Sequence, residues 1–322
     1  MSIKNRYDFM VLLEAKYSNP NGDPDLENFP RQDFETNLGY ITDIALKRRV
    51  RDYVLDKYNG ESGKNIIIRA INNVNEDIFK IVEKAKKDGK TNQEVACEEY
   101  WDVRTFGGVL SSGKNAGQIN GPVQLSFGKS IDEIEIYNAT ISAPQRYGEN
   151  LNSLAEFDKA YNDKNDNDRR TLGKKAFIPY GLYLFTGTIS ANLAEKTGFS
   201  EDDLSLLLEA LLQSYNNCNT ASKQGVSVLS PVIIFKHIGS ENSGEKDREN
   251  EARLGCAPAY KLFNTVHINR KEDVDFPRDF TDYKISIDTT KIPKSVELGF
   301  KINPFEPVSW NPTEDDFIEI IK

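Results

Sequence analysis

The order in which strand-like and helix-like segments follow one another constrains this chain more than any other feature of its sequence. Short apolar runs rich in strand-forming residues lie at 8–16, 122–130, 134–142, 177–190 and 226–237. Helical periodicity extends from a capping Thr42 to Asn59-Gly60, and again over 201–215 after an acidic first turn. With insertions set aside, the order is strand, helix, strand, strand, helix, strand, which is the split βαβ arrangement of ferredoxin-like and RNA-recognition folds. We therefore expect an α+β fold of this kind, with 122–130 and 134–142 paired as a hairpin.

Three stretches lie outside this pattern. Residues 61–118 form an insertion, in which we expect a short strand and two helices, at 65–70, 76–87 and 92–100. Residues 144–176 have little apolar periodicity and include the polar run NDKNDNDRR, which predicts an exposed excursion. Pro231 is expected to interrupt the strand that contains it. The last third should hold a charged loop and two short strands, at 239–254, 283–288 and 296–302.

Composition excludes several classes of protein. A chain of 322 residues predicts about two domains or one elaborated domain. The three cysteines are far apart and never in a Cys-x-x-Cys pair, so neither a disulfide framework nor a thiolate zinc site is encoded. This cysteine pattern fits a reducing cytoplasm. Because no apolar window suits a signal sequence or a membrane span, we expect no membrane partner. We also expect no cofactor.

Charge and histidine content narrow the function further. The net charge of −9 argues against nucleic-acid binding over the whole surface but allows a local basic groove. Only His237 and His267 are present, which disfavours mechanisms that need a pair of histidines. The sequence contains neither a Gly-x-Ser-x-Gly motif nor a Gly-x-x-x-x-Gly-Lys-Ser/Thr motif. The carboxylate pairs at 98–99 and 202–203 are expected on helices, the second in a first turn. We find no constellation that supports an enzyme.

Two long windows of the sequence contain no acidic residue, although 50 of the 322 residues are acidic. They are residues 103–131, with Arg104, Lys114 and Lys129, and residues 210–240, with Lys223 and Lys236. A phosphate backbone repels carboxylates, so these windows are candidates for nucleic-acid binding, while buried strands would also exclude charge. The glycine-, serine-, asparagine- and lysine-rich loops inside both windows favour the first interpretation, because their backbone amides can approach an anion closely.

Two further features are candidates for a phosphate-binding site and a calcium-binding site. On the helix that starts at Thr42, Lys47 and Arg51 share a face with Arg48 beside them, which fits either a phosphate contact or a solvated surface. The turn NPNGDPD at 19–25 has oxygen ligands at alternate positions, but its sixth residue is a proline where an EF-hand needs glycine. We therefore expect Asx turns there, with Asp23 or Asp25 able to hold Arg31 or a helix start.

Several long motifs, in the same order, resemble one family. They are NPNGDPDLENFPRQDFETNLGYITDIALKRRVRDYV at 19–54, DVRTFGGVL at 102–110, GPVQLSFGKSID at 121–132, PYGLYLFTGTIS at 179–190 and LAEKTGFSEDDL at 193–204. Together they resemble the backbone subunit, of the RAMP superfamily, of the type I CRISPR effector complex Cascade, subtype I-C. The resemblance implies a modified RNA-recognition palm with inserted fingers and thumb, and a protein that is not a nuclease.

The same resemblance implies the partners and the domain limits. The partners would be CRISPR RNA, target DNA, further copies of the chain in a helical oligomer, and other Cascade subunits. The palm would comprise 1–60, a hairpin at 119–143 and 177–322, with the fingers segment at 61–118 and the thumb segment at 144–176.

The residues in segments that match the family's RNA-facing ones are candidates for RNA binding. They are Asn21, Arg31, Lys47, Arg48, Arg51, Arg104, Phe106, Gln124, Ser126, Lys129 and Lys223. At TASKQG, residues 220–225, the chain departs from the more basic stretch often found in the family, which leaves Lys223 as the one cation. The alternatives are an endoribonuclease of the same superfamily that processes CRISPR transcripts, or a structural oligomer that binds no RNA.

Overall fold

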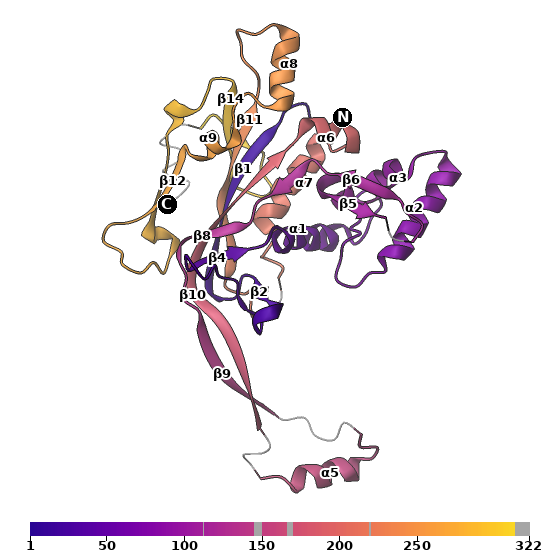
Figure 1. Cartoon of the computed structure of the whole chain (residues 1–322), viewed down its shortest axis with the longest axis vertical. Coiled ribbons are helices and arrows are strands. Elements are labelled where there is room, and N and C mark those ends of the chain that lie inside the picture. Colours follow the sequence, from indigo (N-terminus) through magenta and orange to yellow (C-terminus); the bar gives the residue numbers. More distant parts are fainter. Residues whose placement is uncertain (112, 145–149, 166–169, 219, 313–322) are drawn as a thin grey trace.

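A computed structural model describes residues 1–111, 113–144, 150–165, 170–218 and 220–312. Its centre is a nine-stranded sheet with the order β15-β14-β11-β1-β10-β8-β4, in which β7 and β9 also pair with β10 (Figure 1). The pairings within this sheet are antiparallel. Its strands are β1 (Tyr7–Ser18), β4 (Leu38–Ile41), β7 (Val123–Leu125), β8 (Gly128–Glu133), β9 (Tyr137–Pro144), β10 (Arg170–Ile189), β11 (Val226–His237), β14 (Val296–Lys301) and β15 (Ser309–Trp310). The expected α+β class is confirmed.

The first strand, β1, is the middle of the sheet because both of its faces are apolar. Phe9 and Leu13 pack into the core cluster that includes the helices, whereas Met10 and Leu12 point into clusters on the opposite side. β10 pairs along one edge of β1 and β11 along the other. A strand buried on both faces shows as a continuous apolar run, which is how the sequence predicted it.

Two helices cover one face of the sheet, α1 (Asp43–Tyr58) and α7 (Glu201–Gln213). The Thr42 side chain caps α1 by accepting a hydrogen bond from the Ala45 N–H, and Asn59 ends it in the left-handed conformation, as predicted. The start of α7 is a capping box between Ser200 and Asp203. The two helices are joined where Glu209 accepts hydrogen bonds from Tyr53 and Lys57.

The opposite face of the sheet is closed by the C-terminal third. The hairpin of β12 (Val266–Arg270) and β13 (Tyr283–Ile287), with α9 (Ala259–Phe263), packs against it. The Tyr283 ring stacks on Tyr180 with 6.4 Å between the ring centroids. RNA-recognition domains bind RNA on the open face of their sheet. In this chain that face is covered by the C-terminal third of the protein.

The expected hairpin between 122–130 and 134–142 is not formed. The first stretch contributes β7 and the start of β8, the second contributes β9, and all three strands pair with the same long strand, β10. The half of β10 from 178 pairs with β1, and the half before it pairs with β9. Sequence periodicity identifies strands but not their partners, which is why this pairing was missed.

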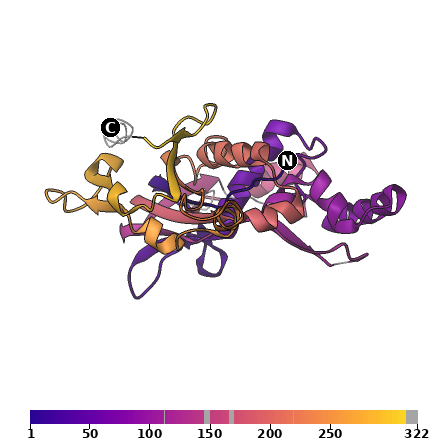
Figure 2. The same ribbon diagram turned by 90° about the horizontal axis from the view of Figure 1, so that it is seen from above.

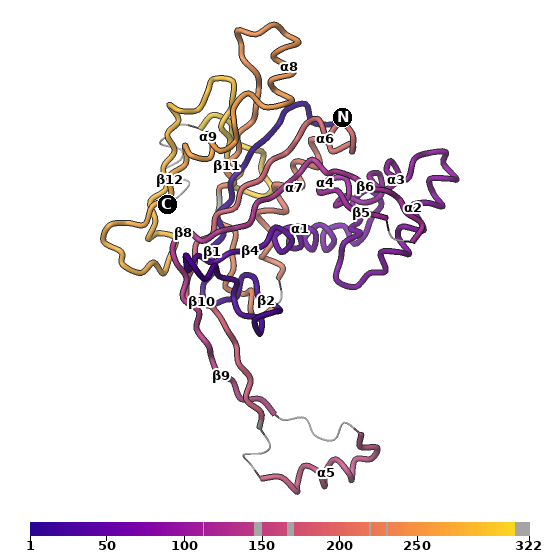
Figure 3. Tube along the Cα trace, viewed as in Figure 1, coloured from indigo at the N-terminus to yellow at the C-terminus, as the bar shows by residue number. Residues whose placement is uncertain are grey.

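The β9–β10 hairpin projects from the sheet and carries α5 (Leu154–Asn162) at its far end, as Figure 3 shows. At its root, Phe177 contacts Tyr17 on one side and Tyr137 on the other, each with 6.1 Å between ring centroids. The described residues of the thumb segment form an exposed excursion, as their polar composition predicted, and include the helix and strands that it did not predict. Residues 145–149 and 166–169 lie outside the described part.

The fingers segment has a core of its own. It contains α2 (Val74–Asp88), α3 (Asn92–Glu99), α4 (Trp101–Phe106), β5 (Gly107–Leu110) and β6 (Gly117–Asn120). The two predicted helices are confirmed, but the strand expected at 65–70 is reduced to one bridge between Asn65 and Tyr100. Gly107 has φ +78°, and a Cβ there would lie 2.3 Å from the Ile119 carbonyl oxygen. Only glycine fits this turn from α4 into β5.

The C-terminal third corrects two expectations. The charged loop expected at 239–254 ends in a helix, α8 (Glu245–Leu254), whose only buried residue is Ala252. β11 runs continuously through Pro231, but its register with β1 shifts nearby, so that Met10 faces Ile233 and Leu12 faces Leu229. β13 and β14 confirm the strands expected near 283–288 and 296–302.

The remaining elements are short. They are β2 (Gly22–Asp23), β3 (Phe29–Pro30), α6 (Ala191–Thr197) and the 3-10 helices at Pro24–Leu26, Phe280–Asp282 and Thr289–Lys291. Seen from above in Figure 2, the fingers helices lie at one end of the molecule and the C-terminal third at the other. Among the described residues, no helix has the length and apolar character that crossing a membrane requires.

Candidate nucleic-acid interface

Asn21 and Thr42 fix the start of α1. The Asn21 carboxamide oxygen accepts hydrogen bonds from the Thr42 N–H at 2.9 Å and from its hydroxyl at 3.2 Å. The loop that carries Asn21 is held by Arg31, whose guanidinium lies 3.0 Å from the Asp23 carboxylate. Asp23 also accepts from the Asp25 N–H, which is the Asx turn that the sequence predicted. The acids of this turn thus serve the loop itself, and the described residues include no cluster suited to a metal ion.

Lys47 links α1 to the sheet. Its ammonium donates to Asp43 at 3.0 Å and to the Gln124 side chain on β7 at 3.3 Å. It also lies 5.8 Å from the centre of the Phe106 ring. Lys47 and Arg51 share a face of α1, as predicted, because Arg51 lies over the same ring at 5.0 Å. Phe106 is 7% exposed and is covered by these two cations.

Gln124, Ser126, Phe127 and Lys129 are exposed along one side of β7 and β8. The Ser126 hydroxyl accepts a hydrogen bond from the Thr186 N–H at 2.9 Å and donates to the Phe127 carbonyl at 3.0 Å. Lys129 is paired in register with Tyr40 of β4. Glycine and serine at 128 and 130 point inward, so the alternation of the strand turns the polar residues outward.

These contacts connect six of the predicted residues into one surface. We call it the α1–β8 surface and define it by Asn21, Arg31, Lys47, Gln124, Ser126 and Lys129. In Figure 1 two of its elements, α1 and β8, lie between the fingers helices and the projecting β9–β10 hairpin. Amide, hydroxyl, ammonium and guanidinium groups are the side chains that contact phosphate and sugar in nucleic-acid complexes.

Lys223 lies beside this surface but points into the protein. Its ammonium donates to the carbonyl oxygens of Asn19 and, at 2.8 Å, of Pro20. Burial, with the positive charge of Arg49 nearby, lowers the pKa of Lys223 to about 8. A direct RNA contact of Lys223 stays a prediction, whereas its contacts in the structure position the loop that carries Asn21.

Arg104 is the centre of a buried network. Its guanidinium makes a bidentate contact with Asp203, at 2.9 and 2.8 Å, and also donates to the carbonyl oxygens of Cys97 and Gly63. Burial alone would raise the pKa of Asp203, but the hydrogen bonds and charge of Arg104 lower it below its ordinary value. These contacts direct all the nitrogens of Arg104 inward, so it joins the fingers segment to α7.

Arg51 and Arg48 are also paired within the chain. Arg51 lies 3.0 Å from Asp102 of α4, which in turn accepts hydrogen bonds from the N–H groups of Ile67 and Ile68. Arg48 lies 2.5 Å from Asp52, one turn further along α1. With Arg31 and Lys47, the structure thus places five predicted cations in ion pairs, and those of Arg51 and Arg104 are buried.

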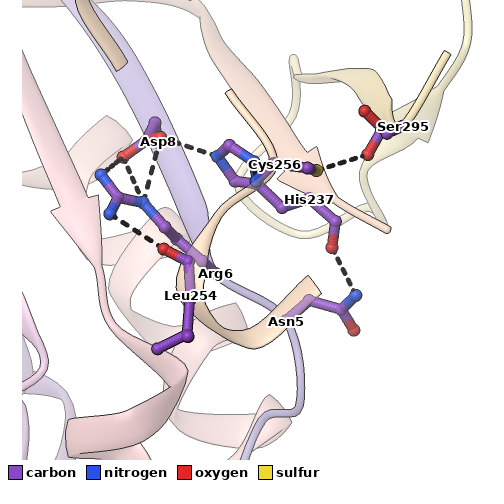
Figure 4. A network of polar contacts seen from close by, with 7 residues as sticks. All are labelled: Asn5, Arg6, Asp8, His237, Leu254, Cys256 and Ser295. Atoms are coloured by element: carbon purple, nitrogen blue, oxygen red, sulfur yellow. Dashed lines mark hydrogen bonds and ion pairs between the residues drawn. The ribbon is translucent and has the colours of Figure 1, made fainter. Parts of the chain in front are cut away.

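The histidines lie away from the α1–β8 surface. His237 is fully buried, with its Nε2 2.8 Å from the Asp8 carboxylate and its Nδ1 accepting from the Cys256 N–H at 3.0 Å (Figure 4). Burial lowers the pKa of His237, but its hydrogen bonds with Asp8 and Cys256 raise it overall. Asp8 also pairs with Arg6 at 3.0 Å. This network ties the ends of β1 and β11 to the loop after α8, and His267 is exposed on β12.

One family model matches most of the chain. The family model described as CRISPR-associated protein Cas7 matches residues 5–288. The CRISPR-associated protein Cas7 of Haloferax volcanii is 28% identical over 254 residues, which cover 70% of this chain and 68% of that protein. Two solved structures are similar at 14% identity. One, titled CRISPR RNA-guided surveillance complex, pre-nicking, has a TM-score of 0.47 and covers 74% of this chain and 80% of its own. The other, a CRISPR RNA-guided surveillance complex, has a TM-score of 0.43 and covers 76% and 74%.

Proposed function

Because the chain belongs to the Cas7 family of CRISPR-associated proteins, we propose that it binds CRISPR RNA as a backbone subunit of an RNA-guided antiviral complex. The observation that supports this proposal is the α1–β8 surface, to which α1, β7, β8 and neighbouring loops contribute polar and cationic side chains. The sequence motifs NPNGDPDLENFP and GPVQLSFGKSID favour assignment of the chain to Cascade of subtype I-C.

The mode of binding follows from the residue types. Lysine, amide and hydroxyl groups recognise phosphate and ribose, which carry no sequence information. The guide would therefore be held whatever its sequence, and its base edges would be left to pair with target DNA. Sequence choice belongs to the RNA, and the protein supplies the path along which it lies.

Several copies would follow one another along the guide, next to other subunits of the complex. A head-to-tail contact that does not close into a ring produces a helical array. The thumb segment supports this view because α5 leaves Leu154 84% exposed and Phe157 42% exposed, far from the core of its own chain. Apolar side chains at such a position are typical of a surface that another molecule covers.

We further infer that the chain holds RNA without cleaving it. General acid–base cleavage needs a proton donor and acceptor near the phosphate. In the part of the chain that the structure describes, the buried histidine is engaged with Asp8 and Cys256, and the α1–β8 surface contains no histidine. The alternative, an endoribonuclease that processes CRISPR transcripts, requires a different set of residues.

The proposal is tested by RNA binding and protection. The protein produced together with its guide should purify with a raised ratio of absorbance at 260 to 280 nm, and it should protect the RNA from added nuclease. Lys47→Ala and Lys129→Ala should weaken binding at low salt, whereas Lys246→Ala, which removes an exposed lysine on α8, should not. Purification free of RNA would contradict the proposal, and discrete cleavage of a repeat-containing transcript would favour the endoribonuclease.

A further inference from the structure

Phe127 is a large apolar residue that the fold leaves uncovered. It lies between β7 and β8 and is 48% exposed, although β7 and β8 belong to the central sheet. Gly128 and Ser130 point inward, so Phe127 and Lys129 point outward on the same side. An exposed aromatic ring on a polar strand edge loses the free energy that burial would provide, so its position calls for a partner.

Tyr40 lies next to Phe127 and stacks on its ring. The two rings are parallel to within 10°, with 6.1 Å between their centroids. Tyr40 belongs to β4, the edge strand, and pairs in register with Lys129 of β8. Tyr40 on β4 and Phe127, which directly precedes β8, therefore form one stacked aromatic area.

Cations flank this aromatic area. The Arg31 guanidinium lies 6.0 Å from the centre of the Tyr40 ring, and Lys129 follows Phe127 by two residues on the same face. The carboxylate of Asp33 lies within electrostatic range of Lys129, but its lowered pKa is set first by the N–H groups and hydroxyl of its own loop. Aromatic rings beside lysine and arginine are the combination that binds single-stranded nucleic acid by stacking and charge.

Phe106 and Phe127 differ in whether a nucleobase can reach the ring. Phe106 has Trp101 edge-on at 5.8 Å and two cations over its face, so no nucleobase can reach it without displacing them. Phe127 has only Tyr40 as an aromatic neighbour among the described residues, and nearly half of its surface is open.

We propose that Phe127, next to Tyr40, stacks on a nucleobase of the bound RNA, as a positioning contact that complements the phosphate contacts of the α1–β8 surface. This inference rests on the proposed function. Stacking is tolerant of sequence because every base has a π-face, so it suits a protein that must hold any guide.

The test compares Phe127→Leu, which keeps an apolar side chain, with Phe305→Leu, which alters a ring that is 75% exposed between β14 and β15. Binding of the full chain to a short labelled single-stranded RNA is measured by fluorescence anisotropy. A matched RNA with abasic nucleotides retains the phosphates and lacks the bases. We expect Phe127→Leu to weaken binding of the intact RNA about tenfold and binding of the abasic RNA little, with Phe305→Leu unchanged. Tyr40→Leu should give a smaller loss of the same kind.

The salt dependence separates stacking from charge. Phe127→Leu should leave the slope of affinity against salt unchanged, whereas Lys129→Ala should reduce it by about one counterion. Equal affinity of Phe127→Leu and the unchanged protein would overturn the proposal, as would equal losses on intact and abasic RNA. Loss of self-association without RNA, at unchanged RNA affinity, would assign the ring to a protein partner instead. If the unchanged protein binds neither RNA, the proposed function itself fails.

Discussion

The two halves of residues 103–131 share a charge pattern, but their cations lie in opposite environments in the structure. Both halves lack acidic residues and contain cations. The first half enters the interior through α4, where Arg104 meets Asp203 of α7. The second half forms β7 and β8, where Gln124, Ser126 and Lys129 are exposed. The same sequence signal thus marked a buried ion-pair network in one place and a candidate binding surface in the other.

The difference teaches that an acid-free stretch of sequence is not an acid-free region of space. The partners of the buried cations come from outside the window: Asp203 from a helix about a hundred residues later, and Asp102 from the residue just before it. A cation whose carboxylate arrives from another element stabilises the fold. A cation that no such element reaches remains available for a ligand, and experiments can separate the two classes.

The largest expected effect is the loss of the buried network. Arg104→Ala leaves Asp203 buried without its partner, so the free energy of unfolding should fall by about 3–5 kcal/mol. Urea denaturation followed by circular dichroism measures the change. Arg48→Ala is the matched control, because the Arg48–Asp52 pair is about one third exposed and its loss should cost at most about 1 kcal/mol. Equal losses in the two variants would contradict the distinction between buried and surface cations.

The same network predicts a dependence of stability on pH. The folded protein lowers the pKa of Asp203, so its contribution is present above the pKa of an unfolded aspartate and is lost as pH falls through the folded value. Asp203→Asn should be less stable near neutral pH, and its stability should decrease less toward acid. Thermal unfolding at several pH values would show this, and parallel curves for both proteins would argue against an ionised Asp203.

A smaller effect is expected on the α1–β8 surface, to which the exposed half contributes β7 and β8. Lys47→Ala should weaken RNA binding roughly tenfold, since a hydrogen bond from a charged group contributes about 1.5 kcal/mol, and it should lower the salt slope by about one. Its free energy of unfolding should fall by about 1 kcal/mol or less, because the Lys47–Asp43 pair is partly exposed and joins residues one turn apart on the same helix. Arg104→Lys, which retains a charge, provides the comparison: if it loses RNA affinity while remaining folded, Arg104 contacts RNA after all.

The smallest effect concerns the start of α1. Thr42→Ala removes the hydroxyl that accepts from the Ala45 N–H, which should cost about 1 kcal/mol of stability. Thr42→Ser retains that hydroxyl and should restore most of the loss. A thermal melt of both variants tests this. No recovery in the serine variant would show that the hydroxyl at position 42 is not what stabilises the helix start.

The sequence predicted local elements well and long-range relations poorly. Thr42 and Asn59 located α1 because caps are local chemistry, and the apolar run of β1 marked a central strand. α8 was missed because its residues, EKDRENEARL, have no apolar stripe and bury only Ala252. The pairing of β9 with β10 was missed because partner choice depends on packing far along the chain.

The candidate site was predicted to a similar extent. Six predicted residues converge on the α1–β8 surface, which motif content alone could indicate. The inward orientation of Arg104 depends on Asp203, and no pattern around residue 104 contains that information. Phe127 was within the predicted window, but a single exposed aromatic residue cannot be distinguished by sequence from a buried one.

β10 is one uninterrupted strand from the thumb hairpin to the middle of the sheet. Mechanically it behaves as a beam that is fixed at one end, where it pairs with β1, β7 and β8. Phe177 contacts Tyr17 and Tyr137 where this beam leaves the sheet. A force applied at α5 would be transmitted along β10 to the centre of the molecule. The direction of the β9–β10 hairpin is therefore set by the central sheet, and any force that bends its tip would strain a central strand of that sheet.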